Sequence, residues 1–341
     1  MNLSALPNSS ALFDLHRQYY GEPSGWPDAA DSHASSHWKS YSQDFHVDID
    51  DQGNLKNLKG VGFGNYQHER MLWRLANYVC CAAHYLRMDN KGEILRLTKM
   101  ALALTSRVPW GCHYLSYDLF RQIHALATIR RHFSPGPEER FSAVVIGDGF
   151  GFLAAILKQV FPGVSITLVD LGKTLFFQCL YLQVLYPACR HALVSEPKEQ
   201  DQFDHQHTDD FLYCPAERLE QLQGLRHRLA VNVCSMQEMN HKEIARYFRY
   251  LRTHADTEAL FYCCNRESKV LPDGEKVEFE QYPWMQTDRN LVDGRPSVYD
   301  FWLSARLRGN GPRLFGCSVP FLDGPDGPIR HRLTMLSSIH A

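Results

Sequence analysis

The segment Phe141-Ser-Ala-Val-Val-Ile146 leads directly into Gly147-Asp-Gly-Phe-Gly151 and then into Phe152-Leu-Ala-Ala-Ile-Leu157. The first part has the apolar, β-branched character of a strand inside a parallel sheet, and the last part is typical of a buried helix. Glycines between a strand and a helix let the backbone approach a ligand closely and direct free N–H groups toward it. We therefore predict a strand, a ligand-binding loop and a helix, although a glycine string of this kind also occurs in plain turns.

An acidic residue follows the glycine loop at the sequence separation that is typical of a ribose-binding carboxylate. The predicted strand Ser165-Ile-Thr-Leu-Val-Asp170 ends in a carboxylate, and its separation from Gly147 is close to the roughly 20 residues at which an acidic side chain reaches the hydroxyls of a bound ribose. An ionised carboxylate can accept hydrogen bonds from both hydroxyls. The alternative is that Asp170 belongs to the turn or cap of the next helix, where Gly172 and Thr174 stand.

The chain after residue 137 alternates short apolar runs with amphipathic ones, which is typical of an α/β, Rossmann-like fold with a mostly parallel sheet covered on both faces. The seven predicted strands are Phe141–Ile146, Ser165–Asp170, Asp210–Cys214, Leu229–Cys234, Leu260–Cys264, Leu314–Val319 and Arg332–Leu336. The predicted helices are Phe152–Val160, Thr174–Leu185, Glu217–Leu222, His241–His254 and Val298–Arg308. The last two strands follow each other across a turn-rich stretch without a helix, which predicts a C-terminal antiparallel hairpin.

The first 137 residues differ from the rest of the chain in composition and in hydrophobic periodicity. Residues 1–60 are rich in Ser, Asp, His and Gly without a sustained period, and we predict a partly ordered N-terminal arm. Residues 61–137 repeat apolar side chains at helical spacing, which predicts a helical N-terminal cap subdomain that ends at Ser134-Pro-Gly-Pro137. Residues 138–341 then form the ligand-binding domain.

The composition excludes several classes of partner. The 341 residues carry 36 Lys plus Arg against 38 Asp plus Glu, so no global positive field is present to hold nucleic acid or an anionic membrane. No apolar run approaches the length that spans a bilayer. The ten cysteines lie mostly in apolar stretches without a C-x-x-C pair, which favours reduced thiols over a zinc site or disulfides. We expect a cytoplasmic protein that binds neither nucleic acid nor membrane.

The position of the third glycine separates the candidate ligands of the loop. A dinucleotide fingerprint places that glycine where Phe152 stands, because the helix must pack closely beside a pyrophosphate. In this chain it comes one residue earlier, at Gly151. The resulting Gly-x-Gly-x-Gly pattern resembles motif I of the class I S-adenosylmethionine-dependent methyltransferases, and the antiparallel chain end is similar to that family's last strand.

Further motifs resemble one group within that class, the bacterial sugar O-methyltransferase family. They cover the chain from about Phe63 onward and are Tyr117-Asp-Leu119, Asn232-Val-Cys-Ser-Met-Gln-Glu-Met239, Phe261-Tyr-Cys-Cys-Asn-Arg266 and Tyr282-Pro-Trp284. The resemblance implies S-adenosylmethionine as the cofactor, held by Gly147, Asp148, Gly149, Gly151, Asp170, Pro215, Ala216 and Asn232. In this assignment the glycine loop binds the methionine and ribose part, Pro215-Ala216 flank the adenine, and Asn232 stands near the methyl group. The Asn/Asp-Pro-Pro-aromatic signature of many amino-methyltransferases is absent from the position of Asn232, which argues against N-methylation of adenine or glutamine.

Two side chains after the fourth predicted strand are candidates for the base that an alcohol acceptor needs. Glu238 and His241 lie within about one helical turn of each other, at the carboxyl end of the sheet where ligands bind. A histidine titrates near neutral pH, which suits a general base. The alternatives are that His241 begins a surface helix and that Glu238 interacts with a helix N-terminus.

Three residues are candidates for binding the methyl acceptor. Arg266, Tyr282 and Trp284 are the predicted substrate-binding residues, since they could form a hydrogen-bonding and aromatic wall for a sugar ring, although Trp284 could equally be core packing. The tract Asp204–Asp210 has metal-ligand residue types without ligand spacing, so we predict a surface loop and no metal.

The sequence thus predicts an O-methyltransferase for a sugar or glycosylated small molecule, with a homodimer as the candidate assembly. A nicotinamide-dependent oxidoreductase and a non-catalytic scaffold are the alternatives.

Overall fold

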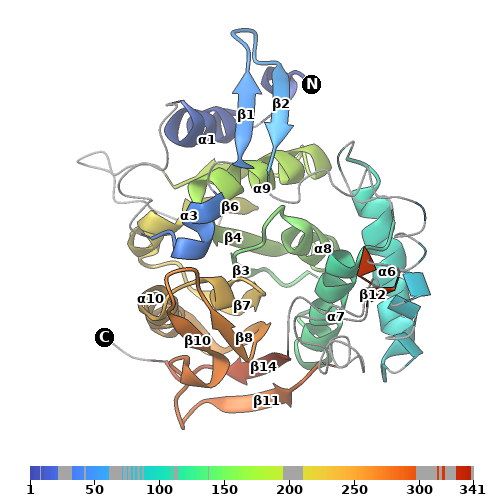
Figure 1. Ribbon diagram of the computed structural model, residues 1–341, viewed down its shortest axis with the longest axis vertical. Helices are drawn as coiled ribbons and strands as arrows, with labels where there is room; N and C mark the ends of the chain where they lie inside the picture. The colour runs from blue at the N-terminus through green and yellow to red at the C-terminus, as the bar shows by residue number, and fades with distance from the viewer. Residues whose placement is uncertain are drawn as a thin grey trace.

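The computed structural model of the chain is shown in Figure 1. It describes residues 1–7, 9–21, 33–41, 44–60, 88–108, 110, 114–136, 138–194, 210–296, 313–314, 317–318 and 328–338, together with single residues between 71 and 86.

An eight-stranded sheet forms the centre of the molecule, in the order β11-β14-β8-β7-β3-β4-β6-β5. All neighbouring strands from β8 to β5 are parallel, and β14 is antiparallel to both β8 and β11. The bounds are β3 Phe141–Ile146, β4 Val164–Asp170, β5 His191–Leu193, β6 Phe211–Pro215, β7 His227–Val233, β8 Ala255–Arg266, β11 Arg289–Gly294 and β14 Ile329–Met335.

The sheet confirms the predicted α/β, class I Rossmann-like fold, with eight strands instead of seven. The antiparallel end is also present, but its strands differ from the predicted pair. β14 lies between β8 and β11, whereas Arg313–Leu314 (β12) pairs with Cys317–Ser318 (β13) in a separate small sheet. The short, mostly polar β11 has no continuous apolar run, which is why periodicity did not reveal it. The predicted helix Val298–Arg308 lies outside the described residues.

Helices cover both faces of the sheet (Figure 1). On one face, α8 (Phe152–Val160), α9 (Gly172–Leu185), α7 (Tyr117–His132) and α6 (Lys91–Thr105) belong to the larger apolar core. On the other face, α10 (His241–Thr253) and the 3-10 helix η3 (Ala216–Leu222) belong to the second core. Both faces of the central strands are therefore buried, which explains their almost unbroken apolar sequences.

The described residues among the first 60 pack onto this frame. They contribute η1 (Leu3–Ala5), α1 (Ser10–Tyr20), α3 (Ser36–Tyr41) and the antiparallel strands β1 (His46–Ile49) and β2 (Leu55–Lys59). Leu12, Leu15 and Tyr19 of α1 are buried, and α1 packs against α9. The division into arm, cap subdomain and ligand-binding domain stays a prediction.

The helix α9 shows why that layer is required. It is apolar on all sides, and almost every residue from Gly172 to Leu185 is buried. A helix of this kind needs a covering on its outer side as well as against the sheet. The aromatic ring of Tyr19 lies where a side chain on Gly172 would stand, within 2.4 Å of the ideal Cβ position.

The remaining elements surround the carboxyl end of β8. They are the 3-10 helices η4 (Met236–Glu238) and η5 (Phe279–Gln281) and the paired strands β9 (Ser268–Val270) and β10 (Lys276–Glu278). Within the part of the chain that the structure describes, no helix has both the length and the apolar character that crossing a membrane requires.

Candidate functional site

The carboxyl ends of β3, β4, β6 and β7 lie side by side and bring the predicted cofactor residues to one edge. In the sheet register, Ile146 of β3 is beside Val169 and Asn232, and Asp170 of β4 is beside Pro215. The loop Gly147–Gly151 therefore begins between Asp170 on one side and the exit of β7 on the other. Parallel α/β sheets bind ligands at this edge.

The three glycines of the loop all have left-handed backbone, and each has a different neighbour. Gly147 (φ 69°) has no room for a side chain, since a Cβ would lie 2.1 Å from Ser235 Oγ. Gly151 (φ 85°) is the N-cap of α8 and packs near the backbone of Gln178. Gly149 (φ 65°) has no atom within 4 Å of its ideal Cβ position among the described residues. The loop is thus closely packed at both ends and open at its middle.

Asp148 fixes the shape of this loop. Its carboxylate accepts hydrogen bonds from the backbone N–H groups of Leu153 (3.0 Å) and Ala154 (2.8 Å) in the first turn of α8. Burial raises the pKa of Asp148 to about 7, against the effect of these two hydrogen bonds, and the charge of Asp170 adds to the increase. The side chain of Asp148, a predicted cofactor residue, therefore binds the N-terminal N–H groups of α8 and in this way ties the glycine loop to the helix.

Asp170 is the acidic group that faces the loop. Its carboxylate accepts from Leu171 N (2.8 Å) and Gln178 Nε2 (2.6 Å), and Gly149 N–H also bonds to it. Burial raises the pKa of Asp170 to about 7, although these hydrogen bonds oppose the rise. Each carboxylate oxygen can accept more than one hydrogen bond, so Asp170 keeps the capacity to bind hydroxyls.

Buried polar atoms in the segments around Asp170 indicate that a ligand completes this site. Within the described residues, Thr174 Oγ1, Gln178 Oε1 and Glu217 Oε2 are buried and have no hydrogen-bond partner. Buried polar groups are normally paired, and leaving one unpaired costs about 1–3 kcal/mol. The acceptor-rich surroundings of Asp170 and the open middle of the glycine loop fit a cofactor that carries ribose hydroxyls.

Pro215 and Ala216 stand where β6 passes into η3, next to Asp170, and Ala216 is buried. Asn232 is fully buried, and its side chain is engaged internally. It donates to Ile146 O (2.9 Å) and accepts from Asn265 Nδ2 (2.8 Å). The side-chain amide of Asn232 therefore links the ends of β3, β7 and β8 through hydrogen bonds.

The backbone leaves β7 through a strained turn. Cys234 has a φ of 60°, a left-handed value that is uncommon for a side chain with a Cβ. Its N–H donates to Cys264 O (2.7 Å), and Ser235 Oγ donates to Ile146 O (3.1 Å). The turn places Ser235 against Gly147, which explains why the first position of the loop has to be glycine.

Glu238 lies in a buried polar cluster at the same edge. Its Oε1 is 3.0 Å from Lys269 Nζ and 3.4 Å from His37 Nε2, and all three side chains are less than one-fifth exposed. Burial raises the pKa of Glu238, but His37 and Lys269 together outweigh that effect, so the pKa lies below its usual range. The charge of Glu238 also raises the pKa of Asp170, which shows that the cluster is close to the cofactor edge.

His241 has other contacts. It is the first residue of α10, and its imidazole Nε2 donates to Lys276 O (3.0 Å) on the exposed side of β10. Its backbone N–H donates to Glu275 Oε1 (2.8 Å). The two predicted bases thus occupy different settings, one in a buried charged cluster and the other at a helix start near the surface.

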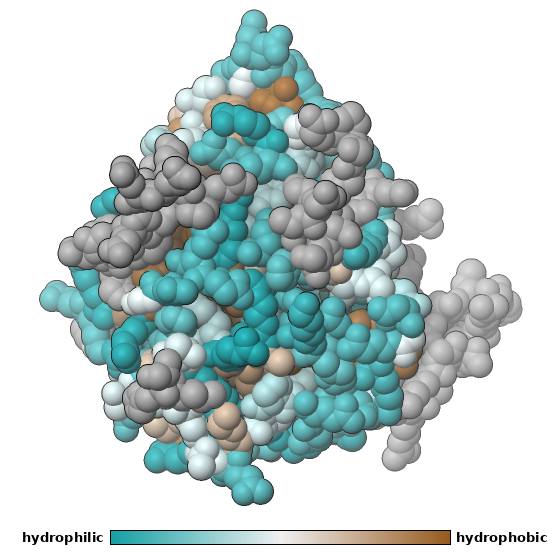
Figure 2. Space-filling model, turned by 90° about the vertical axis from the view of Figure 1, so that its left-hand side faces the viewer, coloured by the Kyte–Doolittle hydropathy of each residue, from teal (hydrophilic) through white to brown (hydrophobic). Residues whose placement is uncertain are grey.

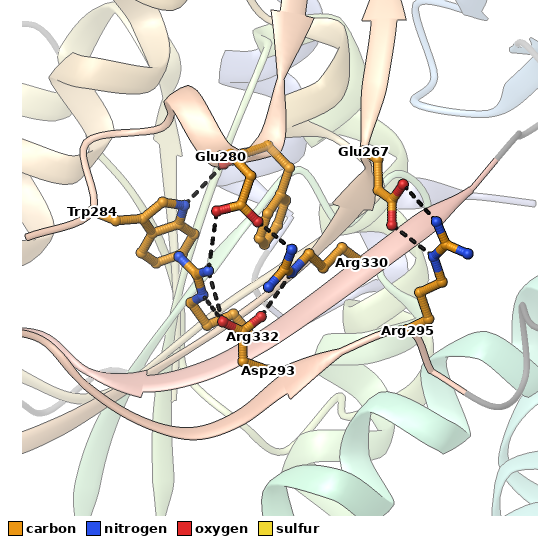
Figure 3. Close-up of polar contacts among 8 residues, drawn as sticks. Glu267, Glu280, Trp284, Asp293, Arg295, Arg330 and Arg332 are labelled. Atoms are coloured by element: carbon orange, nitrogen blue, oxygen red, sulfur yellow. Dashed lines mark hydrogen bonds and ion pairs between the residues drawn. The ribbon is translucent and has the colours of Figure 1, made fainter.

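The predicted substrate wall is not assembled as one surface. Tyr282 is 3% exposed and packs on Phe279 in the second core. Trp284 donates its indole N–H to Phe279 O (2.9 Å), and the Arg332 guanidinium lies 4.5 Å from its ring (Figure 3). Arg266 ends β8, with its backbone N–H bonded to Gln237 Oε1 (2.7 Å). The aromatic pair therefore packs around η5, and only Arg266 is at the carboxyl edge of the sheet.

Sequence reasoning missed His37 and Lys269. Both belong to segments without a recognisable motif, and His37 is contributed by α3 from the far N-terminal end of the chain. Ser35 Oγ also donates to the Glu238 carbonyl, so the segment 33–41 is anchored at the site. The only available signal was the abundance of histidine in residues 33–46.

The N-terminal segment also covers the cofactor residues on their outer side. Tyr19 OH donates to Glu217 Oε1, and Tyr20 OH donates to Lys173 O (2.9 Å). The Phe177 ring lies 5.9 Å from Phe150 of the glycine loop and 5.6 Å from Phe45. The side on which α3 and α10 lie is largely hydrophilic, with scattered apolar residues (Figure 2). The N-terminal segment therefore packs against the residues that follow β4 and β6 and against Phe177 of α9.

The expected loop Asp204–Asp210 lies outside the described residues except for Asp210, whose carboxylate pairs with Lys158 Nζ at 2.6 Å. In the ranges that are described, no three His, Cys, Asp or Glu side chains are grouped as a metal ion would need.

No family model matches the chain, and no curated protein matches it. Among solved structures it is similar to the mitomycin 7-O-methyltransferase MmcR (15% identity, 80% of this chain and 70% of that one, TM-score 0.39). It is similar to the N-methyltransferase NodS from Bradyrhizobium japonicum WM9 (7%, 65% and 97%, TM-score 0.38) and to the pyocyanin biosynthetic protein PhzM (14%, 43% and 38%, TM-score 0.32). The chain thus spans well under half the length of PhzM. Likenesses this remote carry no argument about activity, so the case for function rests on the residues of the site.

Proposed function

We propose that this protein is an S-adenosylmethionine-dependent O-methyltransferase that acts on a hydroxyl of a sugar or a glycosylated small molecule. The observation that carries the proposal is the carboxyl edge of β3 and β4. There, an open glycine loop faces Asp170, and buried oxygen atoms nearby have no partner within the described residues. The cofactor would supply an activated methyl group on a positively charged sulfur.

The residues of the cofactor half have separate roles in this proposal. Asp170 accepts hydrogen bonds from the ribose hydroxyls, and the open middle of the loop at Gly149 lets the ligand approach the backbone. Pro215 and Ala216 form the wall for the adenine beside β6. Asp148 and Asn232 keep the loop and the strand ends in place through their internal hydrogen bonds. A preformed site of this kind aligns the reacting atoms, which is the main requirement of a displacement reaction.

The structure favours S-adenosylmethionine over a dinucleotide at this loop. Phe152, the first residue of α8, is buried, and its ring lies 5.1 Å from that of Tyr181. A dinucleotide site needs a glycine at this position, where the helix comes close to the pyrophosphate. The phenylalanine ring occupies that packing position, which supports a cofactor without a pyrophosphate.

For the proton of the acceptor hydroxyl we propose Glu238 together with His37, in preference to His241. The depressed pKa of Glu238 keeps it ionised at neutral pH, and the neighbouring imidazole is a suitable acceptor when its orientation is fixed by a carboxylate. His241 directs its Nε2 to a backbone carbonyl.

Calorimetric titration tests the cofactor directly. We expect S-adenosylhomocysteine to bind the purified chain and NAD to show no binding; binding of NAD alone would replace the proposal with the oxidoreductase. A screen of sugar-bearing acceptors by mass spectrometry would then detect methyl addition. Cofactor binding without methylation of any acceptor would support the non-catalytic scaffold. The cytoplasmic location and the homodimer stay predictions.

A further inference from the structure

Two cysteines meet where β7 ends beside β8. Cys234 directly follows β7, and Cys264 of β8 lies beside Val233 in the sheet register. The backbone N–H of Cys234 donates to Cys264 O (2.7 Å), and the two thiols share a hydrogen bond. Both cysteines are reduced in the structure. The end of β7 therefore holds a pair of thiols in direct contact.

The two thiols lie on the same face of the sheet. Cys264 belongs to the larger apolar core, on the face that α7 covers, and Cys234 packs against that core. Arg121 of α7 donates from one terminal nitrogen to Cys234 Sγ (3.4 Å). The residue before Cys264 is Cys263, which belongs to the second core and accepts from Asn265 Nδ2 (3.2 Å). A disulfide requires side chains that approach each other, so Cys264 is the partner that fits Cys234.

The two thiols differ in accessibility and in acidity. Cys234 is partly exposed, whereas Cys264 is 1% exposed. Burial raises the pKa of the Cys264 thiol well above its usual range, and the neighbouring Cys234 adds to the increase. Arg121 also pairs with Asp118 through its other terminal nitrogen, so its effect on Cys234 is that of a hydrogen bond and not of a net charge. A hydrogen bond to sulfur favours the thiolate, which makes Cys234 the thiol that reacts first.

The turn that carries Cys234 is tied to the glycine loop. Cys234 has a left-handed φ of 60°, and strained backbone of this kind clusters at functional sites. The next residue, Ser235, fills the space beside Gly147, so closely that a Cβ on Gly147 would lie 2.1 Å from its Oγ. Ser235 Oγ also donates to Ile146 O (3.1 Å). A movement of Cys234 is therefore passed on to the first residue of the loop.

We infer that Cys234 is a site of oxidation by hydroperoxides, that Cys264 closes a disulfide with it, and that this bond displaces the turn beside the glycine loop. The Cys234 thiolate attacks one oxygen of hydrogen peroxide and becomes a sulfenic acid, with release of hydroxide. The Cys264 sulfur then attacks the sulfenic sulfur, and its proton leaves with the hydroxyl group as water. The two thiols thus lose two protons and two electrons, and one peroxide molecule becomes two water molecules.

The disulfide has to move one of the two segments. Bonded sulfur atoms are about 2.05 Å apart, much closer than two hydrogen-bonded thiols. Cys264 is held in β8, between β7 and β14, so the turn at Cys234 takes up the movement and carries Ser235 away from its place beside Gly147. The resulting loss of affinity for S-adenosylhomocysteine rests on the proposed function, whereas the disulfide and the displaced loop do not.

Peptide mass spectrometry on the full chain after treatment with hydrogen peroxide tests the disulfide. We expect a cross-link between the peptides of Cys234 and Cys264, with the loss of two hydrogen atoms, and dithiothreitol should reverse it. Hydrogen–deuterium exchange of residues 147–151 should be faster in the cross-linked protein, because Ser235 no longer packs on Gly147. In calorimetry the Kd for S-adenosylhomocysteine should rise about tenfold or more, since a shift of about 1 Å in a preformed site is costly.

Substitutions of adjacent cysteines in β8 provide the matched control, because their side chains belong to opposite faces of the sheet. Cys264→Ala should give no cross-link and leave a sulfenic acid at Cys234 that dimedone traps, whereas Cys263→Ala should form the cross-link as the parent does. A cross-link through Cys263, no cross-link in the folded parent, or unchanged exchange of the loop after cross-linking would each overturn the inference. A reduced parent that binds no S-adenosylhomocysteine would contradict the proposed function alone, since the cross-link and the exchange are measured without it.

Discussion

The proposed cofactor half and the proposed acceptor half of the carboxyl edge differ in how their residues are held. In the cofactor half, Gly147, Asp170 and Pro215 stand at the ends of β3, β4 and β6, and the sheet register alone brings them together. In the acceptor half, Glu238 follows β7 in a short 3-10 helix, while its partners His37 and Lys269 come from α3 and β9. Strand ends place the first set; contacts between distant segments place the second.

The largest expected effect is in the cofactor half, at Gly149. Gly149→Val should abolish measurable binding of S-adenosylhomocysteine, because the branched side chain enters the open middle of the loop and its φ of 65° is unfavourable for valine. The fold should survive, since no described atom lies within 4 Å of the new Cβ. Calorimetry measures the binding, and circular dichroism checks the fold. Tight binding in the folded variant would show that the loop is only a turn.

The next effect is in the acceptor half and separates the two candidate bases. Glu238→Gln should lower kcat by about 10²–10⁴ with cofactor affinity preserved, because the neutral amide removes the carboxylate that orients the His37 imidazole as proton acceptor. His241→Ala is the matched comparison and should leave kcat within a few-fold, since that imidazole contacts Lys276 O.

Steady-state kinetics on a methylated acceptor provides the measurement, and His37→Ala should follow Glu238→Gln. The opposite result, a collapse of turnover in His241→Ala with little effect of Glu238→Gln, would return the base to His241. A loss of activity with EDTA that magnesium restores would instead assign the role to a bound cation.

Asp170→Ala returns to the cofactor half with a smaller effect. Each lost hydrogen bond from a ribose hydroxyl to the carboxylate is worth about 1.5–3 kcal/mol, so the Kd for S-adenosylhomocysteine should rise at least about tenfold. Calorimetry on the folded variant gives this value directly. An unchanged Kd would leave Asp170 as a turn residue that supports Leu171 and Gln178.

The same carboxylate should make the stability of the ligand-free protein depend on pH. Burial raises the pKa of Asp170 from 3.8 to about 7, so the folded state binds the proton more tightly than the unfolded chain does. The stability contribution is therefore complete below about pH 4 and is lost as the pH rises toward 7, by at most about 1.4 kcal/mol per pH unit.

Asp170→Asn removes this titration. The variant should gain stability relative to the parent between pH 4 and pH 8, as measured by urea unfolding at several pH values. Asp148, whose pKa is also raised to about 7 by burial, keeps part of the pH dependence in the variant. A difference in unfolding free energy that does not change with pH would contradict the raised pKa of Asp170.

The sequence was sufficient for the parts that local pattern controls. The bounds of β3 and α8 agree with those predicted, because an unbroken apolar strand and a glycine N-cap are both local signals. The polar β11 and the covering role of α1 have no such signal. The helix α9 was expected to be amphipathic, but it is buried on almost every side, and no local signal in the sequence marks the segment that covers its outer side. The role of His37 could not be predicted for the same reason, since its contact with Glu238 forms only in the folded chain.

The smallest expected effect concerns Trp284, where the predicted acceptor wall and the observed core packing give different results. Trp284→Phe removes the indole N–H bond to Phe279 O and weakens the contact with the Arg332 guanidinium, at a cost of about 1–2 kcal/mol in unfolding free energy. The aromatic packing on Phe248 is kept in large part. Because the partly buried ring packs against the second core around η5, KM for the acceptor and the Kd of the cofactor should stay unchanged. Urea unfolding and steady-state kinetics on the same preparation decide between the two assignments: a raised KM with unaltered stability would return Trp284 to the acceptor site and extend that site toward β14.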